Sequence, residues 1–149
     1  QALVGSQSIV GILDIKKGLF GGYSAYTENG RKKIKNNVSD IILDMQNAGV
    51  GEIVINSIDR DGTKEGYDFD LIDKFREKIK VPLTILGGAG SYEDIKKVIE
   101  RYGIIGISAG SLFVYQGRYN AVLINFLSRE NLDEIEHITR SIYQIKWKY

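Results

Sequence analysis

The sequence contains no cysteine and a single histidine, His137. The absence of cysteine excludes disulfides, thiolate nucleophiles and cysteine-bound metals. Because the one histidine lies in the polar C-terminal stretch, we expect neither a histidine-based catalytic triad nor a histidine-rich metal site. No lysine-containing phosphate loop of the Walker type is present. We therefore expect no metal and no cofactor.

Charge of one sign and long apolar runs are also missing. Lys and Arg number 20 against 19 Asp and Glu, a net charge of +1, so nothing favours a nucleic-acid or membrane surface. No apolar run approaches the roughly 18 residues of a membrane span, and no signal-peptide pattern is visible. We expect a cytoplasmic protein. Its 149 residues and hydrophobic content of 43% suffice for one domain with a core.

Short apolar runs alternate with segments whose apolar residues recur at helical spacing. The first run, residues 8–14, is continuous and predicts a strand buried on both faces, as in a parallel sheet. A small hairpin is predicted within residues 16–37. The predicted strands are residues 8–14, 52–56, 83–86 and 104–109, and the predicted helices are residues 38–48, 68–79, 91–102 and 120–126.

Strict alternation of strand and helix means an α/β fold with a parallel sheet. A small open doubly wound sheet and half of a (βα)8 TIM-type barrel both fit, since a complete barrel takes about 250 residues. Glycine turns after the third and fourth strands favour strands 5–8 of a barrel, which bind phosphate there. Residues 1–127 would form this half barrel and residues 128–149 a polar helical tail. Open strand edges would demand self-pairing or a missing N-terminal half.

Glycine and small polar residues follow three of the predicted strands. Gly62 follows the second strand, Gly87 and Gly88 follow the third, and Gly110 and Ser111 follow the fourth. Backbone N–H groups in such turns, and at the start of a helix, suit an anion. Together the turns predict a site for a phosphorylated small-molecule substrate.

Three carboxylates lie at the same predicted edge of the sheet. Asp14 ends the first strand, and Asp59 and Asp61 follow the second. Asp59 and Asp61 are two residues apart, so both side chains could point to the same side, towards the mouth, which is the open end of the barrel at the carboxyl ends of the strands. There they could divide acid and base roles. For Asp59 the alternative is structural, as a loop cap or a partner of Arg60 or a lysine. Asp61, beside the glycine turn, is the stronger catalytic candidate.

Seven short blocks of the sequence form a specific pattern. The most specific block is Ser57-Ile58-Asp59-Arg60-Asp61-Gly62-Thr63, and the others are Gly5-Ser6-Gln7, Asp14-Ile15-Lys16, Asn47-Ala48-Gly49, Gly51-Glu52-Ile53, Gly66-Tyr67-Asp68 and Gly87-Gly88-Ala89-Gly90. With these blocks, residues 5 to about 125 resemble the cyclase subunit family of imidazole glycerol phosphate synthase. The resemblance implies that they form the C-terminal half of that family's (βα)8 barrel.

The resemblance implies an ammonia-dependent cyclase and lyase of histidine biosynthesis. A glutaminase subunit, forming a heterodimer at the bottom of the barrel, would release ammonia. The ammonia would react at the top face with a bis-phosphate aminoimidazole carboxamide ribonucleotide and yield imidazole glycerol phosphate. A second phosphate site and a further catalytic aspartate would belong to the first half of the barrel, so this chain alone would be incomplete as an enzyme.

The resemblance also assigns roles to single residues. Asp61 corresponds to one catalytic aspartate, and Asp14 to a carboxylate lining the same mouth. One phosphate would be gripped by the loops after strands 6 to 8. The positions implied for that grip are Gly62, Gly88 and Ser111, with Gly87 and Gly110 adjacent.

Two positions at the mouth depart from the family pattern. Leu86 stands where serine is usual, and Asn56 where threonine is usual. These residues, with the segment 113–125, look like a paralogue that delivers ammonia-derived nitrogen to an activated sugar in surface-glycan synthesis. The phosphate turns favour the first function and the mouth substitutions the second. A non-catalytic half-barrel scaffold is the third alternative.

Overall fold

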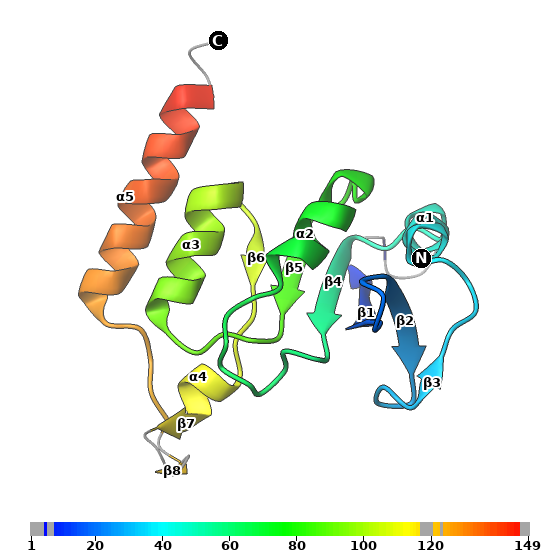
Figure 1. The fold of residues 1–149 in the computed structure, drawn as a ribbon. Helices are drawn as coiled ribbons and strands as arrows, with labels where there is room; N and C mark the ends of the chain where they lie inside the picture. Colours follow the sequence, from blue (N-terminus) through cyan, green and yellow to red (C-terminus); the bar gives the residue numbers. More distant parts are fainter. Residues whose placement is uncertain (1–4, 6–7, 117–120, 123, 147–149) are drawn as a thin grey trace.

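The computed structural model describes residues 5, 8–116, 121–122 and 124–146. A six-stranded sheet has the order β3-β2-β1-β4-β5-β6, in which β1, β4, β5 and β6 are parallel and the β2–β3 hairpin is antiparallel (Figure 1). The strands are β1 (Val10–Lys17), β2 (Tyr23–Thr27), β3 (Lys32–Lys33), β4 (Glu52–Ser57), β5 (Leu83–Leu86), β6 (Gly106–Ile107), β7 (Tyr115–Gln116) and β8 (Ala121–Val122). The helices are α1 (Val38–Asn47), α2 (Phe69–Phe75), the short 3-10 helix η2 (Arg76–Lys78), α3 (Tyr92–Tyr102), α4 (Ser111–Val114) and α5 (Arg129–Lys146).

This order confirms the predicted α/β fold with a parallel sheet. After the β2–β3 hairpin, strand and helix alternate, and α1, α2 and α3 each return the chain to begin the next parallel strand. The barrel is not closed by the described residues, because β3 and β6 stand at the two edges of the sheet. The predicted hairpin within residues 16–37 is also present, with Tyr26 opposite Lys33.

Side-chain caps begin α2 and α3 at the residues where the sequence predicted these two helices to start. The Asp68 carboxylate accepts from the Leu71 N–H (3.0 Å) at the start of α2, and the Ser91 hydroxyl accepts from the Asp94 N–H at the start of α3. The Tyr23 hydroxyl also donates to the Asp68 carboxylate (3.0 Å), which braces the β2–β3 hairpin against α2. Burial and this hydrogen bond raise the pKa of Tyr23 to about 12.

One face of the sheet packs against the helices and the other lies open. Leu13 and Ile15 of β1 point to the helices and are buried, whereas Val10 and Ile12 are 50% and 62% exposed. The expectation that this strand is buried on both faces is therefore wrong for the described residues. Those residues form helices against one face only, and we call the opposite face the inner face.

The segment after α4 differs from the sequence prediction. A helix was expected over residues 120–126, but residues 121–122 form β8, paired with β7, and residues 124–126 are not helical. Residues 120 and 123 lie outside the described part. β-Branched Val122 and Ile124 favour an extended chain, and the Asn125 N–H donates to the Phe113 carbonyl (2.8 Å). These contacts hold the segment alongside α4.

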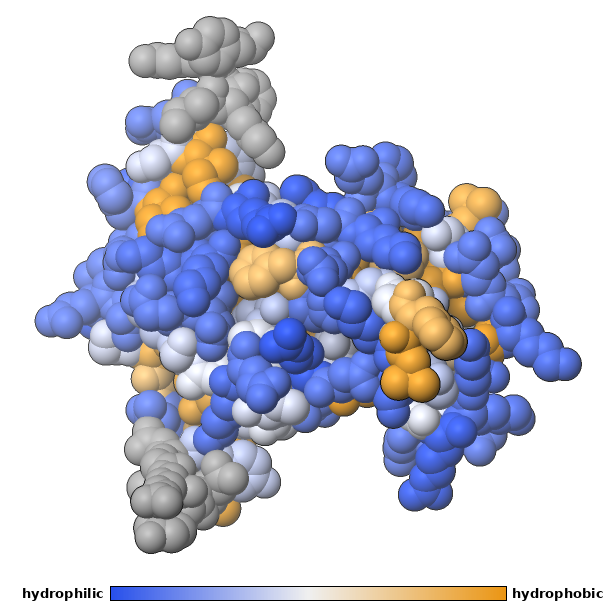
Figure 2. All heavy atoms as spheres, in the orientation of Figure 1, coloured by the Kyte–Doolittle hydropathy of each residue, from blue (hydrophilic) through white to orange (hydrophobic). Residues whose placement is uncertain are grey.

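Helix α5 lies beside α3 (Figure 1). Glu134 of α5 accepts hydrogen bonds from Lys96 and from the Tyr92 hydroxyl (2.8 Å), both on α3. These two hydrogen bonds lower the pKa of Glu134. The space-filling view shows a largely hydrophilic face with separate hydrophobic areas, one of them over α5 (Figure 2). The division of the chain at residue 127 stays a prediction. Among the described helices, none has the length and apolar character needed to cross a membrane.

Candidate active site

A small hollow lies where β4, β5 and β6 end. It is partly open to solvent, has a cavity volume of about 10 Å³, and lies at the end of the sheet where α4 begins (Figure 1). Because parallel strands present their carboxyl ends at one edge, the turns that follow them meet there. The structure brings six of the predicted site residues to its wall. They are Asp61, Gly62, Gly87, Gly88, Gly110 and Ser111.

The turn after β4 places Asp61 at this wall. The N–H groups of Arg60 and Asp61 both donate to the Ser57 carbonyl, at 3.0 and 2.9 Å, and so fold the chain back directly after the strand. Asp61 is exposed, and no described residue hydrogen-bonds to its carboxylate. Because only the backbone of Asp61 is held, its carboxylate can exchange a proton with a bound molecule.

Asp59, two residues earlier, faces a different way. Its carboxylate accepts from the backbone N–H of Lys17 (2.6 Å) at the end of β1 and lies 3.9 Å from the Lys16 amine. The hypothesis that Asp59 and Asp61 face the same substrate is therefore wrong for Asp59. The structural alternative holds, since Asp59 ties the loop after β4 to β1.

The turn after β5 is fixed by contacts that only glycine allows. Gly88 has φ +107°, and its carbonyl accepts from the Gly66 N–H (2.8 Å). A Cβ on Gly88 would lie 2.2 Å from the Gly66 carbonyl oxygen, and a Cβ on Gly87 would lie 2.5 Å from the Ser57 carbonyl oxygen. The backbone of this turn therefore packs directly on the ends of β4 and its loop.

The start of α3 is not available to an anion. Asp94 accepts hydrogen bonds from the N–H groups of Gly90 (3.1 Å) and Ser91 (3.0 Å) and from the Ser91 hydroxyl (3.0 Å). From the sequence, free backbone N–H donors are expected here, because a glycine turn leads into the helix. The capping box supplies an internal carboxylate instead, so any anion in the hollow contacts the Gly87–Gly88 backbone rather than the helix terminus.

The turn after β6 is open. Gly110 precedes α4, no side chain caps this helix, and a Cβ on Gly110 would meet nothing within 4 Å. Gly110 and Ser111 therefore line the hollow at a helix start that has no competing side-chain cap. Behind the hollow, the hydroxyl of buried Tyr67 donates to the Ser108 carbonyl (3.0 Å) and links the loop after β4 to β6. Sequence reasoning did not assign this role to Tyr67.

Asp14 does not line the hollow. It lies on the inner face of β1, in register with Asn56 of β4, whose side-chain amide donates to the Asp14 carboxylate (2.9 Å). The sequence marked Asn56 as a departure from a family pattern, but nothing in the sequence pairs it with Asp14. Asp14 and the hollow are thus two parts of one mouth, with Asn56 between them.

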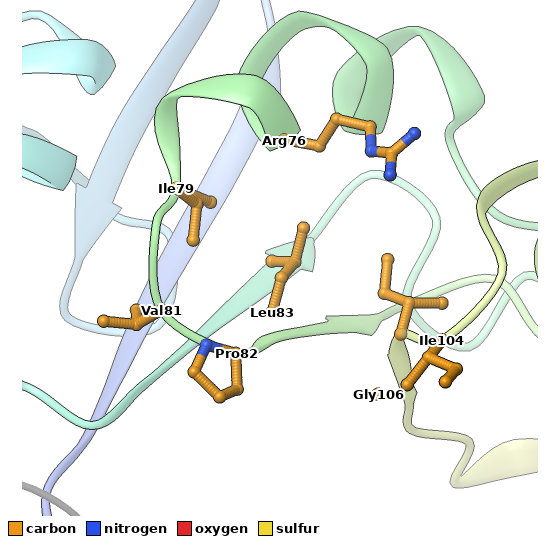
Figure 3. Close-up of a pocket in the computed structure, with 8 residues that line it drawn as sticks. Arg76, Ile79, Val81, Pro82, Leu83, Ile104 and Gly106 are labelled. Atoms are coloured by element: carbon orange, nitrogen blue, oxygen red, sulfur yellow. The ribbon is translucent and has the colours of Figure 1, made fainter. Parts of the chain in front are cut away.

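A larger groove lies at the opposite ends of the strands. It has a cavity volume of about 350 Å³ and is walled mainly by aliphatic side chains, with Arg76 at one end (Figure 3). Leu83 and Gly106, at the amino ends of β5 and β6, belong to its wall. Because no carboxylate lines it, it lacks the groups for acid–base chemistry, and we assign the site to the smaller hollow.

The two glycine turns allow a prediction about stability. Gly88→Ala should destabilise the intact protein by at least about 2 kcal/mol, because φ is positive and the added methyl meets the Gly66 carbonyl. Gly110→Ala is the matched control and should change stability by less than about 0.5 kcal/mol, because space around it is open. Equal unfolding midpoints in urea for the two variants would contradict the packing described for Gly88.

The described part of the chain contains no group of three His, Cys, Asp or Glu side chains arranged to hold a metal ion. The donors of the residues that line the hollow are backbone N–H groups and the hydroxyls of Ser108 and Ser111, which suit an anion.

The fold and the hollow define part of a parallel α/β fold in which glycine turns and a carboxylate meet at the carboxyl ends of the strands. The family described as histidine biosynthesis protein matches residues 1–120. The chain belongs to this family, whose members are TIM barrels.

Proteins of known name are similar over most of this chain. One of Vibrio vulnificus, named "Putative imidazole glycerol phosphate synthase subunit hisF3", is 49% identical over 126 residues, 84% of this chain and 48% of the relative. One of Leptospira interrogans, named "Putative imidazole glycerol phosphate synthase subunit HisF", is 47% identical over 133 residues, which are 89% of this chain and 52% of the relative. One of Streptococcus sanguinis, named "Imidazole glycerol phosphate synthase subunit HisF", is 36% identical over 111 residues, which are 74% of this chain and 44% of the relative. The chain spans about half the length of these relatives.

Proposed function

We propose that this chain supplies the phosphate-binding half of an ammonia-dependent cyclase of the imidazole glycerol phosphate synthase type. The substrate proposed is a bis-phosphate aminoimidazole carboxamide ribonucleotide. Ammonia contributes the nitrogen that closes the imidazole ring, and imidazole glycerol phosphate and an aminoimidazole carboxamide ribotide are released. The names of the relatives support this reaction, and the observation in the structure that supports it is the meeting of Asp61 with three glycine turns.

The proposed roles follow from what each group can do. The backbone N–H groups at Gly62, Gly88 and Ser111 hold one phosphate, with Gly87 and Gly110 as the adjacent turn residues. The Asp61 carboxylate exchanges a proton with the ligand as the ring closes. Asp14 accepts hydrogen bonds from the part of the ligand that lies over β1.

The proposed partner is a glutaminase subunit that releases ammonia at the opposite end of the barrel. The relatives are named as subunits of a synthase, which supports a complex of this kind. A preceding half barrel or a second copy of the chain would close the sheet edges at β3 and β6. The proposed location is the cytoplasm.

The test is a turnover assay of the intact protein with the bis-phosphate nucleotide and an ammonium salt, without a glutaminase. Formation of imidazole glycerol phosphate that rises with the concentration of free ammonia would support the proposal. No product at any ammonia concentration, from protein that binds the nucleotide, would overturn it.

A second candidate is transfer of ammonia-derived nitrogen to an activated sugar. The observation that favours it is that the two departures from the family pattern, Asn56 and Leu86, lie side by side in register on β4 and β5. Turnover of a nucleotide-activated sugar, with none of the aminoimidazole nucleotide, would select this candidate.

A further inference from the structure

Three side chains form a row across the inner face of the sheet. Asp14 on β1, Asn56 on β4 and Leu86 on β5 are partners in register, and on neighbouring parallel strands such partners share a face. Leu86 also lines the hollow. The row therefore joins Asp14 to the proposed phosphate site, and Asn56 stands at its centre.

Asp14 determines which way the Asn56 amide points. Its Oδ1 accepts from the Asn56 Nδ2 at 2.9 Å. An ionised carboxylate only accepts hydrogen bonds, so the amide nitrogen has to face Asp14 and the amide oxygen has to face away. The oxygen points towards the turn after β5, where a Cβ on Gly87 would lie 3.2 Å from it.

This amide oxygen is buried without a partner. Asn56 is 9% exposed, and its Oδ1 accepts no hydrogen bond from any described residue. A buried acceptor that has lost its water and gained no donor is unfavourable for folding. Leucine has the same branched shape and carries no oxygen that could be left unpaired. An acceptor kept in such a position is suited to receive a donor from a bound molecule.

We propose that Asn56 is a specificity-determining residue of the candidate active site, and that its Oδ1 accepts a hydrogen bond from a small N–H or O–H donor bound in the mouth. The donor must be small because the oxygen is buried. Leu86, the next residue in the row, offers no hydrogen bond, so recognition of the donor falls to Asn56. Two donors are possible, ammonia and an amine or hydroxyl group of the phosphorylated substrate. Both come from the proposed function, and in this respect the proposal rests on it.

The test is Asn56→Leu in the intact protein, with KM measured separately for ammonia and for the phosphorylated substrate. We expect KM for one of the two to rise at least about 10-fold, with a smaller change in kcat, because the lost acceptor contributes to binding. A rise for ammonia alone identifies ammonia as the donor, and a rise for the other substrate alone identifies its amine or hydroxyl. The melting temperature should change little, because the variant removes both the unpaired oxygen and the hydrogen bond to Asp14. Asn56→Thr keeps an oxygen and should recover part of the loss.

Two controls separate recognition from folding. Inorganic phosphate should inhibit Asn56→Leu and the wild type equally, because phosphate lies on the glycine turns. Asn36→Leu, at an exposed asparagine that does not line the hollow, should change neither KM. A lower melting temperature for Asn56→Leu with both KM values unchanged would overturn the proposal, since the amide would then be only structural.

Failure of the proposed function gives a different result. In that case the wild type turns over a nucleotide-activated sugar but not the aminoimidazole nucleotide. The two KM comparisons are then made with the sugar and ammonia, and the same outcomes decide the role of Asn56.

Discussion

Asp61→Asn should reduce ammonia-dependent turnover by about 100-fold to 10,000-fold, the range typical of a lost general acid or base. The amide has nearly the size of the carboxylate but cannot take up and return a proton. Because the backbone of the turn is held by the Ser57 carbonyl rather than by the Asp61 side chain, the loop should keep its shape. The affinity for the phosphorylated substrate should therefore stay within about three-fold of wild type.

Asp59→Asn is the matched control, in the same loop and with the same change of charge. Its carboxylate accepts from the Lys17 N–H, and an asparagine oxygen can accept the same bond. We expect its kcat to stay within about five-fold of wild type. Substantial turnover by Asp61→Asn, or an equal loss in both variants, would rule out a specific acid–base role for Asp61.

Ser111→Asp should raise KM for the phosphorylated substrate at least about 100-fold. Two unit charges of the same sign 4 Å apart repel by about 4 kcal/mol at the effective dielectric constant of a protein surface. Ser111 is the first residue of α4 and lines the hollow, so the new carboxylate would lie against the proposed phosphate. The helix itself should tolerate the change, because acidic residues are favourable in a first turn.

Ser128→Asp is the control for Ser111→Asp. Ser128 precedes α5, where its hydroxyl accepts from the Asn131 N–H (3.2 Å), and aspartate can replace that cap. The same charge is thus added at the start of another helix that does not line the hollow, and KM should not change. Unaltered KM in both variants would show that no phosphate binds beside Ser111.

The local sequence predicted the fold where one residue or spacing decides the structure. The caps at Asp68 and Ser91 are set by residues within a single turn of helix, so the pattern is sufficient. The open inner face could not be predicted. Val10 and Ile12 have the composition of a strand buried on both sides, and only the arrangement of the whole sheet shows that one side lies uncovered in this chain.

The site was predictable in outline for a similar reason. Turns after parallel strands meet at one edge, so the grouping of Gly62, Gly88 and Ser111 followed from topology. Contacts between distant residues did not follow. The hydrogen bond from the Asn56 side-chain amide to the Asp14 carboxylate spans 42 positions in sequence. The direction of the Asp59 side chain depends on the backbone N–H of Lys17 in β1.

We infer that the three turns after β4, β5 and β6 hold one phosphate beside Asp61. The most direct measurement is a titration of the isotopically labelled intact protein with inorganic phosphate, followed by the amide resonances in NMR spectra. We expect the largest saturable shifts at Gly62, Gly88 and Ser111, with smaller ones at Gly90 and Ser91, whose N–H groups Asp94 already occupies. Saturable shifts confined to other parts of the chain, or none at these three amides, would contradict the account.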